Sequence, residues 1–189
     1  MIIDEFYKNI VILGSNGTGI SAALKLSRLF RSHYNVKIYL ISNNFNVRNH
    51  IALRLFSKDL KQYSSASRIK KNLEYHVDNI TDIDLKSRKV YLGEKEIYFQ
   101  FLVVNITDKY YHHVFRSSLQ AAGKSEQIIV DDSLREVDMS FIYFLGDNAI
   151  AKLDTGSLVS AVNSVTQKQE KLIAQNIYNE VYGYNRIAV

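Results

Sequence analysis

The sequence predicts an α/β fold in which a central parallel sheet is joined to an antiparallel β-meander. Three observations lead to this prediction. An apolar, β-branched strand at 8–13 runs into a glycine-rich turn and an amphipathic helix. Short alternating runs follow at about 74–99, with turn residues between them. Buried-type apolar strands return at 101–104 and 141–145. The length of 189 residues suits one domain spanning residues 1–189.

The glycine turn is the most informative segment of the chain. It reads Gly14-Ser15-Asn16-Gly17-Thr18-Gly19. A dinucleotide-binding βαβ unit has G-x-G-x-x-G here, because glycines let the backbone approach a pyrophosphate and the helix N-terminus attracts its charge. Asn16 stands at the middle glycine position, where its side chain crowds a pyrophosphate although Asn tolerates positive φ. A Rossmann-like domain is predicted, with either a working phosphate turn or an inactive remnant of one.

The elements of the first half are predicted in order from apolar periodicity and caps. They are a helix at 20–30, a strand at 36–41, a helix at 48–63 and a short helix at 64–73 capped by Ser64–Ser67.

The second half changes character after residue 73. Its predicted elements are the meander at 74–99, a strand at 101–104, a helix at 110–122 ended by Gly123, strands at 128–130 and 141–145, and a long helix at 157–182. A dehydrogenase-type domain would continue with βαβ units instead of a meander.

Composition excludes several classes of protein. The chain has no cysteine, which rules out disulfides and thiolate metal sites. The formal charge is +5 but the basic residues are scattered, so no nucleic-acid partner is predicted. No apolar run reaches the length of a transmembrane segment, and acids at positions 4 and 5 argue against a signal peptide. An intracellular protein, cytoplasmic or mitochondrial, is expected.

Five segments in this order resemble the FAD-binding domain of the pyridine-nucleotide-disulfide oxidoreductase superfamily. The similarity is to the branch of apoptosis-inducing-factor-like proteins and type II NADH dehydrogenases. The segments are the glycine turn, the second strand with its following aromatic at 37–45, a helix at 52–59, a hairpin and strand at 90–107, and a strand ending in Gly-Asp at 129–147. The resemblance implies non-covalently bound FAD.

It also implies a cofactor site, and no catalytic or metal-binding residue is predicted beside it. The implied contacts are Gly14, Ser15, Asn16, Gly17, Gly19, Ser42, Asn43, Thr107, Gly146 and Asp147. By resemblance, Asp147 bonds a ribitol hydroxyl. Two departures weaken the site: Ser42 replaces the acid that would bind the adenosine ribose, and 105–107 reads Asn-Ile-Thr instead of Ala-Thr-Gly. The adjacent histidines 112 and 113 face apart and make a poor metal chelate.

The connector at about 108–140 is short. Family members insert an NADH domain there, but about 36 residues separate Thr107 from Phe144, and independent domains rarely fall below about 50 residues. The NADH domain and the family's C-terminal domain are therefore expected to be absent. Their loss should expose apolar area around Phe115, Leu119 and Ile187, which predicts a homodimer or a larger protein complex.

Two hypotheses for function follow from the resemblance. The first is a minimal flavin-binding, oxidoreductase-like protein that is inactive alone because it has no NADH site. The second is a pseudoenzyme that keeps the truncated fold without the cofactor and acts as a protein-binding or assembly module.

Overall fold

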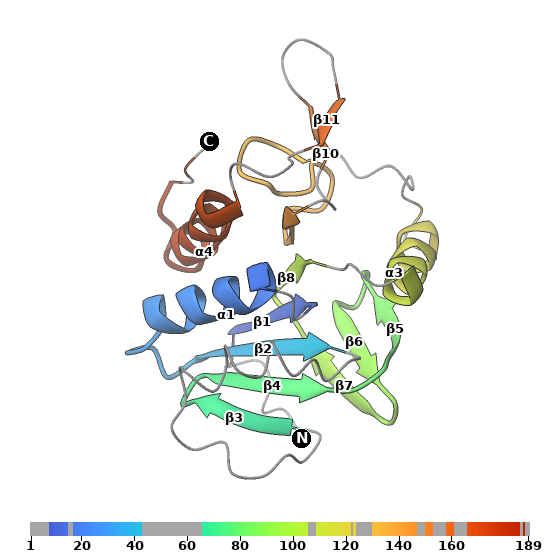
Figure 1. The fold of residues 1–189 in the computed structure, drawn as a ribbon, viewed down its shortest axis with the longest axis horizontal. Helices are drawn as coiled ribbons and strands as arrows, with labels where there is room; N and C mark the ends of the chain where they lie inside the picture. The colour runs from blue at the N-terminus through green and yellow to red at the C-terminus, as the bar shows by residue number, and fades with distance from the viewer. Residues whose placement is uncertain are drawn as a thin grey trace.

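A six-stranded sheet forms the centre of the molecule (Figure 1). The computed structural model describes residues 8–14, 17–42, 66–105, 109–121, 123, 130–146, 150–152, 158–160, 166–185 and 187. The sheet order is β3-β4-β2-β1-β8-β9, and every pair is parallel except β3 with β4. The predicted α/β fold with a central parallel sheet is confirmed.

The strands of this sheet are short, and those at its centre are apolar. They are β1 (Lys8–Leu13), β2 (Val36–Ser42), β3 (Ala66–Lys70), β4 (Leu73–Val77), β8 (Phe101–Val104) and β9 (Ile142–Phe144). The four residues from Ile10 to Leu13 in β1 have no exposed surface. A strand buried on both faces needs this uninterrupted aliphatic run, which is why β1 occupies the middle of the sheet.

Two helices pack together on one side of the sheet (Figure 1). They are α1 (Gly17–Leu29) and α4 (Thr166–Tyr182). Their contact has a buried polar centre, because the Glu170 carboxylate accepts hydrogen bonds from the Ser21 hydroxyl and, at 2.5 Å, from the Lys25 ammonium. A buried carboxylate requires such partners, so this contact fixes how α4 lies on α1.

The chain crosses from β4 to β8 through a separate antiparallel sheet. It consists of β5 (Ile80–Asp84), β6 (Lys89–Leu92) and β7 (Lys95–Tyr98). Helix α3 (Lys109–Ala121) follows β8 and packs on β5, and Gly123 after it has a φ of 75°. The predicted helix at 110–122 and its glycine stop are confirmed.

The meander boundary at residue 74 was wrong. Residues 73–77 form β4, which pairs in parallel with β2, and the antiparallel sheet begins only at Ile80. Alternating burial looks the same in a meander strand and in a parallel strand near the sheet edge, so the pattern alone did not separate them.

The short helix predicted at 64–73 was also wrong. The segment contains β3 and the turn into β4. Asn72 in this turn accepts a hydrogen bond from the Ser27 hydroxyl at 2.7 Å, and its carbonyl accepts one from the Ile38 N–H at 2.8 Å. These contacts with α1 and β2 hold the hairpin, and local propensity contains no information about them.

The terminal helix begins later than predicted. Residues 158–160 form β11 (Leu158–Ser160), which pairs antiparallel with β10 (Ile150–Lys152), and α4 starts at Thr166. Pairing with β10 uses the backbone groups that a helix at these residues would need. The predicted helix at 48–63 lies outside the described residues, as do Ile128 and Ile129, while Val130 forms an isolated bridge to Glu136.

The prediction of an exposed apolar surface was wrong at two of its three positions. Phe115 and Leu119 are each 2% exposed, and the Phe115 ring meets Phe144 edge-on at 5.7 Å between centroids. Helix α3 therefore turns its apolar side onto the core. Ile187 is 48% exposed, as expected.

Candidate functional site

The glycine turn lies at the carboxyl end of β1, in the middle of the parallel sheet. Gly14 has a φ of 105°, which only glycine adopts readily, and its N–H donates to the Ile41 carbonyl at 2.9 Å. In open α/β sheets, ligands bind outside the carboxyl ends of the strands. The turn therefore lies where a ligand is expected.

Gly19 allows the first turn of α1 to approach this bend closely. A Cβ built on Gly19 would stand 2.1 Å from the Gly14 carbonyl oxygen and 2.9 Å from Asn105 Nδ2. Neither distance is possible for a real side chain, so only glycine fits. This is the role of the third glycine in a dinucleotide turn, which permits close packing of helix and strand.

Gly17 begins α1 and has open space around it. A Cβ at Gly17 would meet no atom within 4 Å, and the residue is exposed. The free N–H groups of a helix N-terminus thus face an accessible volume at Gly17, which suits an anion.

Gly146 marks the matching end of β9. Its φ is 65°, and its N–H donates to the Oε1 of Gln169 on α4 at 3.3 Å. Gln169 is only 2% exposed, so the chain after β9 is tied to the start of α4. The carboxyl ends of β1 and β9 are thereby fixed on either side of β8.

Asn105 joins these two ends and was absent from the predicted site. It follows β8 directly, is 2% exposed, and its N–H donates to the Leu13 carbonyl at 2.8 Å. Its Nδ2 faces Gly19, while its Oδ1 lies 3.5 Å from where a Gly146 Cβ would be. A polar residue directly after a fully apolar strand was the available signal in the sequence.

The structure brings Gly14, Gly19 and Gly146 together around Asn105. Ser42 lies one strand further out, at the end of β2, and is 6% exposed. The other predicted site residues lie outside the described part of the chain, namely Ser15, Asn16, Asn43, Thr107 and Asp147.

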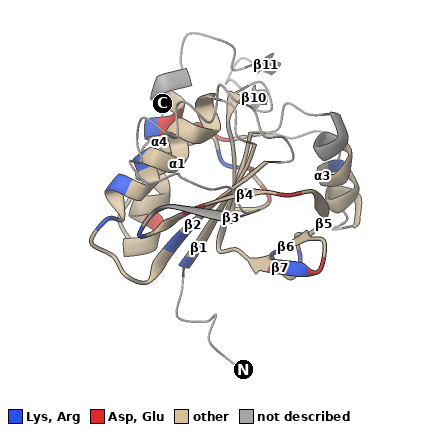
Figure 2. Ribbon diagram, turned by 60° about the horizontal axis from the view of Figure 1, so that its bottom comes forward, with Lys and Arg blue, Asp and Glu red and all other residues tan. Residues whose placement is uncertain are grey.

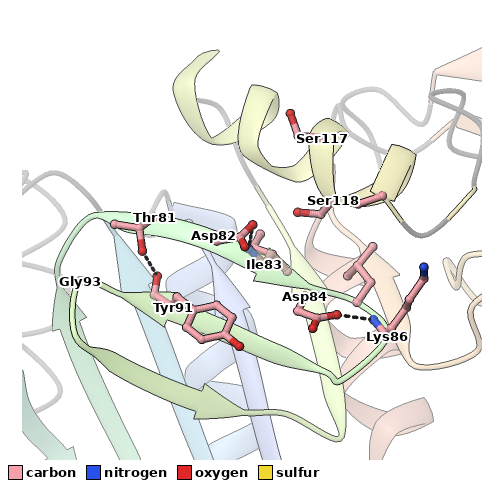
Figure 3. Close-up of a pocket in the computed structure, with 11 residues that line it drawn as sticks. Thr81, Asp82, Ile83, Asp84, Lys86, Tyr91, Gly93, Ser117 and Ser118 are labelled. Carbon is pink, nitrogen blue, oxygen red and sulfur yellow. Dashed lines mark hydrogen bonds between the residues drawn. The ribbon is translucent and has the colours of Figure 1, made fainter.

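A hollow lies elsewhere, between α3 and the meander (Figure 3). Its volume is about 690 Å³, and its polar lining includes Asp82 and Asp84 from β5 and Ser117 and Ser118 from α3. The groups facing it serve local structure. Ser118 Oγ donates to the Val114 carbonyl at 2.8 Å.

Asp84 in this hollow is a turn residue. Its Oδ1 accepts from the N–H groups of Lys86 at 2.9 Å and Ser87 at 3.0 Å, and its Oδ2 accepts from the Ser87 hydroxyl at 2.5 Å. The Ser87 hydroxyl, followed by these backbone donors, holds the pKa of the Asp84 carboxyl below its ordinary value. The shift reflects a turn and does not indicate catalysis.

Charge is distributed unevenly over the elements. Basic residues lie along α1, whereas the chain from the end of β4 into β5 carries aspartates (Figure 2).

His113 is exposed on α3, and among the described residues no group of three or more His, Asp or Glu side chains converges on a metal position. In the same described part, no helix has the length and apolar character needed to span a membrane.

Comparison with known proteins supports the fold. No protein-family model and no curated protein matches the sequence. A pyridine nucleotide-disulfide family oxidoreductase from Enterococcus faecalis V583 superposes with a TM-score of 0.56 at 12% identity, over 90% of this chain and 68% of that one. The crystal structure of Fdr9 superposes with a TM-score of 0.53 at 10% identity, over 90% of this chain and 74% of that one. The chain has the fold of pyridine nucleotide-disulfide oxidoreductases, which confirms the resemblance at the level of fold.

Proposed function

We propose that this chain binds FAD non-covalently at the carboxyl edge of its parallel sheet. It is a minimal flavoprotein-like domain related to FAD-dependent NAD(P)H oxidoreductases, without an NADH site of its own. The observation that carries the proposal is the approach of Gly19 to the Gly14 carbonyl, beside the open space at Gly17. A phosphate-binding turn requires such close packing of helix and strand. Outside such a turn, a glycine in a helix only costs conformational entropy on folding.

The described residues fit the pyrophosphate of a dinucleotide. The open space at Gly17 leaves room for it, and the first N–H groups of α1 donate to it. Gly146 has a φ of 65° directly before Asp147, which by the resemblance would hold the ribitol. When bound, FAD supplies the capacity to accept and release electrons. The domain itself binds, orients and partly covers the cofactor.

The crossover through the meander favours FAD over a nicotinamide nucleotide as the resident cofactor. The chain returns from β4 to β8 through β5–β7 instead of a further βαβ unit. The five resembling segments of the sequence include the last hairpin of this meander, at 90–107, and the resemblance implies FAD on such a sheet. In the same resemblance, NADH belongs to an inserted domain.

The connector after β8 supports the absence of an NADH site. Its described part contains α3, which packs on β5, and a turn region at 130–141 that bridges back to β9. Neither of these segments is a βαβ unit. We therefore expect the purified chain to oxidise neither NADH nor NADPH with a quinone or dye acceptor, even with FAD added. Saturable turnover would contradict this.

A second candidate is a pseudoenzyme that keeps the fold as a protein-binding or assembly module. The specific observation in its favour is Asn105, a polar side chain 2% exposed between Gly19 and Gly146, where the family has the alanine of Ala-Thr-Gly. Ser42, in place of the acid that would bind the adenosine ribose, also favours the pseudoenzyme. This candidate expects an intact fold in which side chains occupy the space at the sheet edge that a cofactor would need.

Thermal unfolding with and without FAD separates the two candidates. A ligand at about one hundred times its Kd stabilises by about 2.7 kcal/mol, which raises Tm by roughly 5–10 °C for a chain of this size. The flavin proposal expects this shift and a yellow purified protein. A colourless protein whose Tm does not respond to FAD would leave the pseudoenzyme.

Gly17→Leu provides the matched variant. Open space surrounds Gly17, so the unliganded Tm should stay near that of the wild type, while the new side chain fills the pyrophosphate volume and removes the FAD shift. An equal FAD shift in the variant would mean that FAD binds elsewhere.

A further inference from the structure

A cluster of aromatic rings lies where α1 and α4 end. The centroid of the His33 ring is 4.9 Å from that of Tyr182 and 6.1 Å from that of Tyr178. Tyr184 extends the row at 6.4 Å from Tyr182, and the fully buried Phe30 packs beneath it. Tyr182 is 36% exposed and Tyr184 is 62% exposed. We call the outer members of the cluster, His33, Tyr182 and Tyr184, the tyrosine surface.

The chain that follows α4 is bonded back onto that helix. Asn179 Nδ2 donates to the Asn185 carbonyl at 2.7 Å, and the Tyr184 N–H donates to the Asn179 carbonyl at 2.7 Å. The fully buried Asn176 exchanges two hydrogen bonds with the backbone of Ile187, at 2.7 and 2.8 Å. The exposed side chains of Tyr184 and Ile187 are therefore carried on an ordered backbone, which lowers the entropy that a partner must overcome when it binds them.

The charge around the tyrosine surface is positive. Lys8 Nζ donates to the carbonyl of the residue before Tyr182, at 3.0 Å. Arg31 is exposed just beyond the end of α1. Glu180, the acid in the last turn of α4, accepts a hydrogen bond at 2.7 Å from the hydroxyl of Tyr143, a buried residue of β9. Its carboxylate is thus directed toward the sheet, and the two cations stand beside the exposed rings.

This combination favours a protein partner that carries negative charge. Tyrosine and arginine are enriched in protein interfaces. Symmetric contact with a second copy of the chain would bring like charges together, which is unfavourable. The Tyr182 ring is tilted by 46° to His33 and by 52° to Tyr178, so the rings lean on one another and do not form separate faces on which bases could stack.

We propose that the tyrosine surface binds an acidic protein segment. Apolar side chains of the segment contact Tyr182 and Tyr184, and its carboxylates pair with Lys8 and Arg31. The surface lies at the amino end of β1, roughly 20 Å along the strand from the glycine turn. The inference therefore goes beyond the proposed nucleotide binding and does not depend on it.

An NMR titration of the full-length, ¹⁵N-labelled chain tests the proposal. The probe is a synthetic peptide of glutamate, serine and leucine, and its companion has glutamine in place of glutamate. The acidic peptide should shift amide signals at 31–34 and 178–187, and its affinity should fall as salt rises. The companion should bind about three- to tenfold more weakly, the range for two exposed ion pairs.

Two pairs of variants locate the contact. Tyr182→Ser and Tyr98→Ser are matched, because Tyr98 on β7 is 37% exposed, and only Tyr182→Ser should weaken binding. Tyr184→Ser should weaken it as well, and repeats the test at a side chain that packs less. Arg31→Gln should remove part of the salt dependence, whereas Lys171→Gln, at an exposed cation near the other end of α4, should not.

Three outcomes would overturn the proposal. The first is a titration with the acidic peptide that shifts no signals, or shifts only signals outside the tyrosine surface. The second is a dimer, seen by sedimentation, that dissociates in Tyr184→Ser, because the surface would then serve a second copy of the chain. The third is tighter binding of oligothymidylate or of phosphatidylserine vesicles than of the peptide, lost in the same variant.

Discussion

The carboxyl edge of the parallel sheet and the hollow under α3 differ in how their atoms are used. The hollow has a volume of about 690 Å³, yet Asp84 and Ser118 in it are bonded to their own turn and helix. At the edge, Gly14 has a positive φ and Gly19 approaches the Gly14 carbonyl closely, so neither position accommodates a side chain. The volume of a cavity is therefore a poorer guide here than the backbone conformation at the sheet edge.

The two regions also differ in the backbone conformations that they require of the fold. Positive φ at Gly14 and Gly146 and a glycine inside a helix at Gly19 each give up conformational entropy or packing. The turn of Asp84 stabilises the meander locally, although it too contains a positive φ, of 57° at Arg88. What distinguishes the sheet edge is the approach of Gly19 to the Gly14 carbonyl, which excludes a side chain next to the start of a helix.

The largest expected effect comes from Gly19→Ala. The new Cβ would stand 2.1 Å from the Gly14 carbonyl oxygen, a backbone atom, so no change of side-chain rotamer can relieve the clash. We expect a loss of about 3 kcal/mol or more in the free energy of unfolding, measured by urea denaturation.

Gly17→Ala is the control two residues away on the same helix. Nothing lies within 4 Å of the new methyl group, so stability should stay equal or rise by up to about 1 kcal/mol. Equal costs for the two variants would show that the approach of α1 to Gly14 is not a tight one.

A smaller effect is expected for Asp147→Ala, which follows Gly146 and lies outside the described residues. If Asp147 holds a flavin hydroxyl, FAD affinity should fall by roughly 1.5–3 kcal/mol, while the unliganded fold loses about 1 kcal/mol or less. Fluorescence titration of FAD measures the first and thermal unfolding the second. Asp132→Ala, at an exposed acid before β9, should change neither.

Asn16→Gly should act in the opposite direction and more weakly. Removing the side chain at the middle position of the turn opens room beside the pyrophosphate, so FAD should bind a few-fold more tightly. The same titration measures this. An unchanged or weaker Kd would mean that the turn, whose residues 15 and 16 are outside the described part, differs from a dinucleotide turn.

The sequence predicted the segment at 8–42 better than the segment at 64–77. Between residues 8 and 42, strand, turn, helix and strand depend on local signals, namely an aliphatic run, glycines and a helical period. The hairpin around Asn72 depends instead on Ser27 and Ile38, which are distant in sequence. Local patterns do not encode such contacts.

The same contrast between local and long-range signals explains which residues of the candidate site the sequence identified. Gly14, Gly19 and Gly146 were identified from motifs, because each has a local conformational reason. Asn105 was missed, because its importance comes from neighbouring strands that the sheet brings to one edge. The exposed surface predicted at Phe115 failed for a related reason, since its ring packs against Phe144 of β9, which is distant in sequence.

The smallest effect is expected for Asp84→Asn in the hollow under α3. The pKa of Asp84 lies below its ordinary value of 3.8, chiefly because of the Ser87 hydroxyl, so the unfolded chain binds its proton more readily than the folded one. The carboxylate therefore stabilises the fold above pH 3.8, and this contribution is lost as the pH falls through the lower pKa of the folded state. Urea denaturation should show a variant slightly less stable than wild type at neutral pH, with the two converging in acid, and the exposure of the side chain keeps the difference small. FAD affinity should not change, because Asp84 serves its own turn. A variant with unaltered stability and weakened FAD binding would reverse the comparison and make the hollow under α3 the ligand site.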